Sequence, residues 1–167
     1  MIETTNLIIK QFTADDTPFV FELLNTETWK QFIGDRNIQI LDDALGYIEK
    51  VLAPYYDKYG YGPWLVSLKE KGEPIGLCGL FKRDYLDQPD LGFAFMPQYA
   101  GKGLAYESCL AILEYVTKAY NIKKLYATTT AANIRSQGLL ERCGFVRNGE
   151  ITPPEGEPLL LYHLSLQ

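Results

Sequence analysis

Hydrophobic and polar positions recur with two different periods along the chain, and the changes of period divide it into expected strands and helices. Short runs rich in β-branched and apolar residues predict strands at 7–12, 64–68, 74–81, 91–95, 124–130, 145–149 and 159–166. Apolar positions three or four residues apart predict helices at 13–28, 42–59, 104–120 and 133–143. The expected order is β-α-α-β-β-β-α-β-α-β-β, which predicts a mixed α+β fold.

Local signals indicate where the first two helices begin and break. Thr13 followed by Asp16 has the form of a capping box, and Asp42 or Asp43 is expected to cap the second helix. Pro54 lies inside that second helix and predicts a kink or an early end. The residues expected on its buried face are Leu45, Ile48, Val51, Leu52 and Tyr55.

The segment 90–108 contains a strand, a glycine-rich turn and the first turns of a helix, in that order. Pro97 ends the strand because it cannot continue a central ladder of hydrogen bonds. Gly101 and Gly103 let the backbone approach a ligand with no Cβ in the way. The free N–H groups and the dipole at the start of the following helix favour an anion, so the turn is a candidate phosphate site.

Two well-known phosphate motifs do not fit this turn. A Walker loop requires Gly-Lys-Ser/Thr, whereas Lys102 is followed by Gly103 and Leu104. A dinucleotide-binding fingerprint requires a third glycine where this chain has Tyr106. The remaining pattern is Gln98-x-x-Gly101-x-Gly103 after a strand, and a glycine-rich connection without a ligand stays open as the alternative.

Composition adds limits on the class of protein. The 167 residues are 47% hydrophobic and 22% charged, which is typical of a single globular domain, here taken as residues 1–167. No apolar run is long enough to span a bilayer and no signal-peptide pattern opens the chain, so we expect a cytoplasmic protein that does not bind membranes. The net charge of −5 argues against a nucleic-acid partner and mildly favours a cationic one, such as an amine.

The cysteines and the single histidine suggest no reactive centre. Cys78, Cys109 and Cys143 are far apart in the sequence and odd in number, so we expect reduced core thiols rather than a disulfide framework or a metal-ligand cluster. A cysteine nucleophile assisted by His163 is conceivable. Cys109 lies on an apolar helix, Cys143 stands just before a helix-ending glycine and His163 lies in an alternating strand, which favours structural roles instead.

Three motifs in the expected order resemble the GNAT superfamily of N-acetyltransferases, in particular its ribosomal-protein N-acetyltransferase branch. They are the opening TNLIIKQFTADD (5–16), the strand and loop DLGFAFMPQYAGKGLA (90–105), and NIRS (133–136) followed by LERCGF (140–145). Together they cover nearly the whole chain. The resemblance implies a largely antiparallel central sheet of about seven strands, flanked by helices and splayed between the fourth and fifth strands.

The resemblance also implies acetyl-CoA as co-substrate and assigns residues to it. Gln98 would shape the loop. The backbone amides that would hold the pyrophosphate are those of Ala100, Gly101, Lys102, Gly103, Leu104 and Ala105. Phe95 and Met96 would offer strand amides to the pantetheine arm. Asn133 would meet the cofactor and Ser136 would lie near the departing thiolate. For these last two the alternatives are a plain helix N-cap and an ordinary first-turn residue.

Catalytic assignments follow from the same resemblance. Asp90 stands where the family often carries a carboxylate facing the cleft, so it is the candidate base, acting directly or through water. The alternative is that Asp90 is only a turn residue at the start of the strand. Leu140 occupies the position of the tyrosine that serves many members as general acid. Ser136 is therefore the substitute acid, or the thiolate leaves unaided.

The expected reaction is direct attack of a primary amine, on a protein N-terminus or a small molecule, on acetyl-CoA in a ternary complex. The alternative is a CoA-binding homologue or sensor without turnover, and the chain is expected to be a monomer or homodimer. The acceptor would be bound by residues 29–37, 55–64 and 82–89, where no sequence pattern names it.

Overall fold

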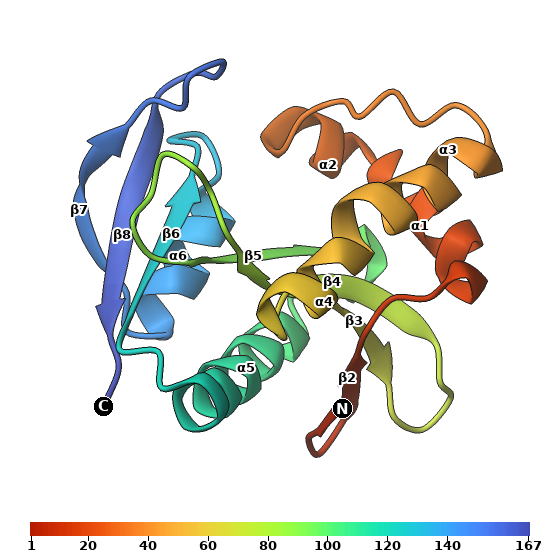
Figure 1. Cartoon of the computed structure of the whole chain (residues 1–167), viewed down its shortest axis with the longest axis horizontal. Coiled ribbons are helices and arrows are strands. Elements are labelled where there is room, and N and C mark those ends of the chain that lie inside the picture. Colours follow the sequence, from red (N-terminus) through yellow and green to blue (C-terminus); the bar gives the residue numbers. More distant parts are fainter.

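The computed structural model describes all 167 residues and contains one eight-stranded sheet in the order β1-β2-β3-β4-β5-β6-β8-β7 (Figure 1). Only β5 and β6 pair in parallel; all other neighbours are antiparallel. The strands are β1 (Ile2–Glu3), β2 (Leu7–Lys10), β3 (Pro63–Leu68), β4 (Pro74–Phe81), β5 (Asp90–Phe95), β6 (Lys124–Thr129), β7 (Val146–Ile151) and β8 (Leu159–Ser165). The predicted mixed, largely antiparallel α+β fold is confirmed. The additional strand is β1, which is too short to leave a hydrophobic pattern.

The helices follow the predicted segments but are divided more finely. They are η1 (Ala14–Asp16), α1 (Thr17–Leu24), α2 (Glu27–Phe32), α3 (Leu41–Tyr47), η2 (Ile48–Leu52), α4 (Ala53–Tyr59), η3 (Pro97–Tyr99), α5 (Leu104–Tyr120) and α6 (Ile134–Arg142). The first predicted helix ends early because Thr26 caps a new one, accepting a hydrogen bond from the Trp29 N–H at 3.2 Å. No helix combines the length and the apolar character needed to cross a membrane.

The second predicted helix shows how local sequence breaks a helix. The predicted cap at Asp42 or Asp43 is wrong, because Ile40 is the N-cap of α3 and the Asp43 carboxylate, in the first turn, accepts hydrogen bonds from the N–H groups of Gln39 and Ile40. Ahead of Pro54 the chain forms the π-helical turn η2, which confirms the predicted disruption. This turn shifts the helical register, so Val51 is 40% exposed rather than on the buried face.

Helices cover both faces of the sheet and create two hydrophobic cores. The core on the α5 and α6 face includes Leu80, Leu91 and Leu125, whereas the core under α1, α2 and α3 includes Leu77 and Phe81. Residues of β4 therefore alternate between the two cores, as expected of a central strand buried on both faces.

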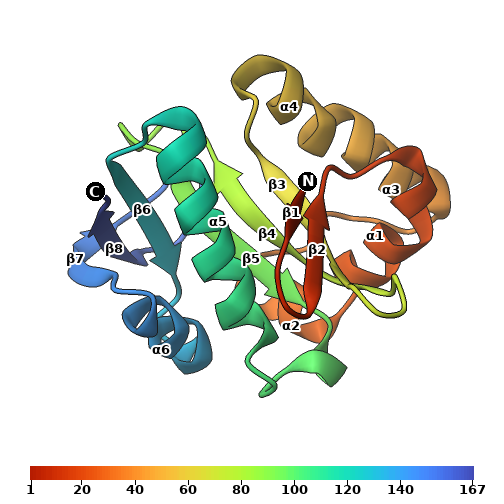
Figure 2. The ribbon, with the colours of Figure 1, turned by 90° about the horizontal axis from the view of Figure 1, so that it is seen from below.

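The pairing of β5 and β6 is confined to one point. Asp90 is in register with Tyr126, whose N–H donates to the Pro89 carbonyl at 3.0 Å, and no further pair follows along the two strands. Figure 1 shows β6, β8 and β7 diverging from β5 as a separate group beside α6. In Figure 2, α5 lies along the sheet between that group and β4. The predicted splay between these strands is confirmed.

Candidate active site

The turn between β5 and α5 has the backbone that its glycines predict. Gly101 and Gly103 both have φ of 77°, the left-handed region that favours glycine. Gly103 is the N-cap of α5. A Cβ placed on either glycine would meet no other atom within 4 Å. These glycines are thus required by the backbone conformation, and they leave an uncovered surface rather than a packed one.

The start of α5 carries a row of unpaired backbone donors. The N–H groups of residues 101–106 donate no hydrogen bond within the chain, whereas the N–H of Glu107 returns to the Gly103 carbonyl at 3.0 Å. Free N–H groups at the positive end of a 17-residue helix are a suitable site for a pyrophosphate. Of the predicted loop amides, only that of Ala100 is already engaged, with the Pro97 carbonyl within η3, where Gln98 also lies.

The two predicted strand amides differ in direction. The Met96 N–H donates to the Ile75 carbonyl of β4 at 2.9 Å, and the Met96 side chain is buried at 6% exposure. Met96 therefore has no free amide for a cofactor, which corrects that part of the prediction. Backbone groups alternate in direction along a strand, so those of Phe95 face the opening between β5 and β6.

The first turn of α6 shows the structural role that the sequence left open for Asn133. Its Oδ1 accepts a hydrogen bond from the Ser136 N–H at 3.2 Å, which makes Asn133 a helix N-cap. Ser136 is half-buried in this first turn. Leu140, one turn later, is 1% exposed and packs in the core. The side chain at the position of the general-acid tyrosine therefore neither reaches the surface nor has a proton to donate.

Asp90 lies at the point where β5 and β6 part. It is 3% exposed, and its Oδ1 lies 3.5 Å from Nε of Arg83. Neither atom makes a hydrogen bond within the protein, so this is a long ion pair. Burial raises the pKa of Asp90 to about 6, although the nearby Arg83 charge opposes this rise. A buried carboxylate with a pKa near neutrality has the properties of a general base.

The surroundings of Asp90 contain Arg83 and Tyr55, which lie in two of the segments expected to bind the acceptor, although no sequence pattern singled out either residue. The Arg83 guanidinium lies over the Phe81 ring at 4.6 Å, and the Tyr55 ring meets the same phenyl edge-on at 5.8 Å. A hollow of about 400 Å³ adjoins Arg83; its lining residues are Lys82, Arg83, Asp84, Tyr85, Pro154 and Glu155. The position of Arg83 depends on the course of the 82–89 loop, which has no repeating pattern that would predict it.

Residues 6–146 match the acetyltransferase (GNAT) domain. The chain belongs to the GNAT acetyltransferase family. Members of this family use acetyl-CoA, and the observed loop and splay fit that co-substrate.

Individual relatives and structures agree with this assignment. The uncharacterized N-acetyltransferase YnaD of Bacillus subtilis is 28% identical over 148 residues, 89% of this chain and 84% of that protein. The spermine/spermidine N(1)-acetyltransferase of the same organism is 28% identical over 129 residues, 69% of this chain and 81% of its own. The structure of RimL, a ribosomal alpha-N-protein acetyltransferase in complex with coenzyme A, superposes with a TM-score of 0.84 at 14% identity, covering 98% of this chain and 96% of the other.

The three cysteines, distant in sequence, meet in the core beneath α5. Cys78 and Cys109 are fully buried with their sulfur atoms 3.8 Å apart, and Cys143 is 9% exposed. A hydrogen bond with Cys109, together with burial, raises the pKa of Cys143. The predicted reduced, buried thiols are confirmed, and they lie together because β4, α5 and the end of α6 converge there.

These thiols should be unreactive in the native protein, because the thiolate is the reactive form and burial suppresses it. We expect no reaction with a disulfide reagent such as DTNB over several minutes at pH 8. Unfolding in guanidinium chloride should release all three cysteines for titration. A rapid reaction of one equivalent in the native state would contradict the structural role of these cysteines.

Proposed function

We propose that the protein transfers the acetyl group of acetyl-CoA to a primary amine by direct attack within a ternary complex. The observation that carries this proposal is the row of free N–H groups at 101–106, next to the opening between β5 and β6. In the proposal, residues 101–105 hold the pyrophosphate with Gln98 shaping the turn, and the Phe95 backbone bonds the pantetheine arm. Bound acetyl-CoA supplies an activated thioester at the opening.

Asp90 is proposed to take the proton of the attacking amine. Free α-amines have a pKa near 8 and lysine amines near 10.4, so most of either is protonated at neutral pH. A carboxylate with a pKa of about 6 is largely ionised there and able to accept that proton, directly or through a water molecule. Its position at the root of the splay supports this role. Ser136 is proposed to lie near the departing thiolate, which leaves with its help or unaided.

The amine class of the acceptor has support from the relatives. A spermine/spermidine acetyltransferase and a ribosomal alpha-N-protein acetyltransferase are named for very different amines. The shared chemistry is a primary amine, and the acceptor is therefore proposed at that level. Arg83, the ion-pair partner of Asp90, lines the hollow together with Asp84, Tyr85 and Glu155, and these residues are proposed to contact the acceptor.

Release of free thiol from acetyl-CoA tests the reaction. A panel containing spermidine, an aminoglycoside and a peptide with a free N-terminus should yield at least one acceptor that accelerates thiol release. Mass spectrometry of that acceptor should show addition of one acetyl group. Thiol release at the background rate with every amine in a broad panel would reject the enzymatic assignment.

One observation favours the second candidate, a CoA-binding homologue without turnover. Leu140, whose side chain cannot donate a proton, is buried at the position where many family members carry the general acid. The two candidates differ in the thiol assay but not in binding. An intact binding site with no turnover would select this second candidate.

Acetyl-CoA should raise the melting temperature, because a ligand that binds only the native state stabilises it. At a concentration of 100 times Kd the stabilisation is about 2.7 kcal/mol, which corresponds to a shift of about 5–10 °C for a chain of this size. Differential scanning fluorimetry with NAD and ATP at equal concentration gives the comparison. Equal shifts from all three ligands would argue against the assignment of the loop.

A further inference from the structure

We propose that Glu107 is a positioning residue for acetyl-CoA binding, which acts by fastening the first turn of α5 to the turn between β1 and β2. This inference rests on the proposed assignment of the 101–105 loop to the pyrophosphate. It extends that assignment to the first residues of the chain, which lie outside the loop and outside the opening between β5 and β6.

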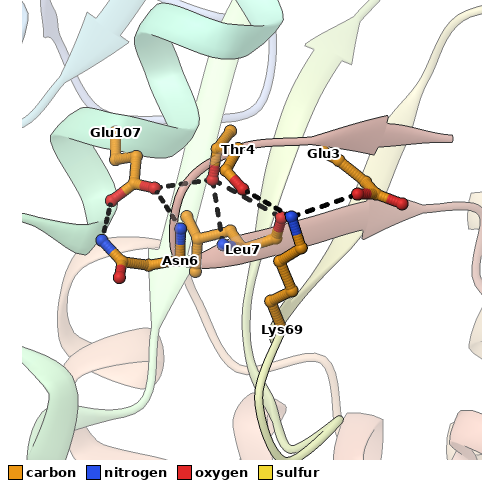
Figure 3. A network of polar contacts seen from close by, with 6 residues as sticks. All are labelled: Glu3, Thr4, Asn6, Leu7, Lys69 and Glu107. Carbon is orange, nitrogen blue, oxygen red and sulfur yellow. Dashed lines mark hydrogen bonds and ion pairs between the residues drawn. The ribbon is translucent and has the colours of Figure 1, made fainter.

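The contacts involve both carboxylate oxygens of Glu107 (Figure 3). The Thr4 hydroxyl donates to Oε1 at 2.6 Å, and the Asn6 backbone N–H donates to the same oxygen at 2.9 Å. The Asn6 side-chain amide donates to Oε2 at 2.9 Å. Three donors from one turn thus converge on a single side chain of α5.

The turn that supplies these donors is itself held in shape. The Thr4 oxygen also accepts the Leu7 N–H at 2.9 Å. Lys69, from the turn after β3, donates to the Thr4 carbonyl at 3.3 Å and pairs with Glu3 at 3.2 Å. β1 has only two residues, and the side-chain contacts that join the turn to α5 are those of Glu107.

Glu107 lies directly after the free N–H groups that are proposed to bind the pyrophosphate. Its N–H bonds the Gly103 carbonyl, so this residue closes the first turn directly behind the free N–H groups. A shift of that turn would move those donors, and a donor contributes fully only at hydrogen-bond distance and angle.

The charge of Glu107 also requires a partner. A carboxylate in the first turn suits the helix dipole, but it would repel a pyrophosphate bound one turn away. Burial raises the pKa of Glu107, yet the hydrogen bonds from Asn6 and Thr4 outweigh it and hold the pKa below its usual range. The carboxylate is therefore ionised at neutral pH, with the donors of the turn directed at its charge.

Glu107→Gln provides the direct test, because it keeps the size but places a donor amide against at least one of the turn's donors. We expect Kd for coenzyme A, measured by calorimetry, to rise about tenfold, because the loss of coupling between the fastened turn and the loop outweighs the removal of the repulsion between Glu107 and the pyrophosphate. With an acceptor that is turned over, KM for acetyl-CoA should rise in parallel while kcat stays near wild type. Glu114→Gln is the matched control, since Glu114 lies on the same helix and pairs only with exposed Lys118.

Thr4→Val tests the other side of the contact and remains informative if Glu107→Gln folds poorly. It should weaken coenzyme A binding severalfold, and the double variant should lose less than the sum of the two single losses, because both remove one interaction. Thr4→Ser should restore most of the affinity.

Hydrogen exchange on the wild-type chain separates positioning from a purely structural role. Binding and fastening are reciprocal, so saturating coenzyme A should slow exchange of the Asn6 amide, which donates to Glu107. Unchanged exchange together with a Kd for Glu107→Gln within twofold of wild type would overturn the inference, as would equal losses in Glu114→Gln. If the wild type binds coenzyme A normally in either of these cases, the assignment of the 101–105 loop to the pyrophosphate survives. If the wild type does not bind coenzyme A, the loop assignment and the role of Glu107 are both overturned.

Discussion

Replacing Gly103 by glutamate should abolish coenzyme A binding and leave the fold intact. The new side chain would start in uncovered space beside the N–H groups of residues 101–106, because its Cβ would meet no other atom within 4 Å. Its negative charge would oppose the pyrophosphate, and like charges brought together cost several kcal/mol. We expect Kd to rise by more than about 100-fold, corresponding to about 2.7 kcal/mol, and the thermal shift with acetyl-CoA to disappear.

The chain offers a control glycine with nearly the same φ. Gly149, in the bulge of β7, has φ of 79°, and a Cβ placed on it would likewise meet no other atom within 4 Å. Glutamate at either glycine should reduce stability by about 1–2 kcal/mol, since both force a side chain into the left-handed conformation. Only the Gly103 variant should lose coenzyme A. Normal binding by that variant would show that the loop has been misassigned.

Asp90→Asn should lower kcat/KM by about 10²–10⁴ with coenzyme A affinity unchanged. The substitution preserves the shape of a side chain that is 3% exposed and removes its ability to accept a proton. The measurement requires the true acceptor, because with a poor substitute binding would limit the rate. Asp42→Asn is the control: Asp42 is exposed in the first turn of α3, outside the proposed acceptor-binding residues, and makes no ion pair.

The pH dependence of kcat/KM should differ between the wild type and Asp90→Asn. Since burial raises the pKa of Asp90 to about 6, the wild-type kcat/KM should decline as the pH falls through 6 and the carboxylate becomes protonated. Asp90→Asn should lack this step and recover part of its activity at higher pH, where more of the amine is already neutral. A variant with wild-type kcat/KM and an unchanged profile would show that Asp90 is a turn residue and another proton acceptor is used.

Features set by neighbouring residues could be predicted from the sequence. The turn at 97–103 depends on a proline that ends a strand and on two glycines with positive φ, and all are local. The capping box of Thr13 and Asp16 and the disruption before Pro54 are of the same kind. The order of strands and helices along the chain could also be predicted, because the period of the hydrophobic positions depends only on how each segment is buried.

Features set by distant partners could not be predicted. The Met96 amide is unavailable because β4 supplies an acceptor, and the strand's own sequence does not reveal which way its amides point. Arg83 meets Asp90 only through the particular course of the loop between them. The contact of Glu107 with Thr4 joins positions 103 residues apart, and no spacing rule connects a helix to the first turn of the chain.

The single point of contact between β5 and β6 has a geometric consequence for the proposed base. Because the two groups of strands meet at Asp90 and Tyr126 and separate beyond them, that contact is the natural pivot for any change in the angle between the two halves of the sheet. A rotation displaces each atom in proportion to its distance from the pivot. Such a rotation would widen the far end of the opening, toward Phe95, enough to admit or release a long molecule, while the proposed proton acceptor would stay almost stationary.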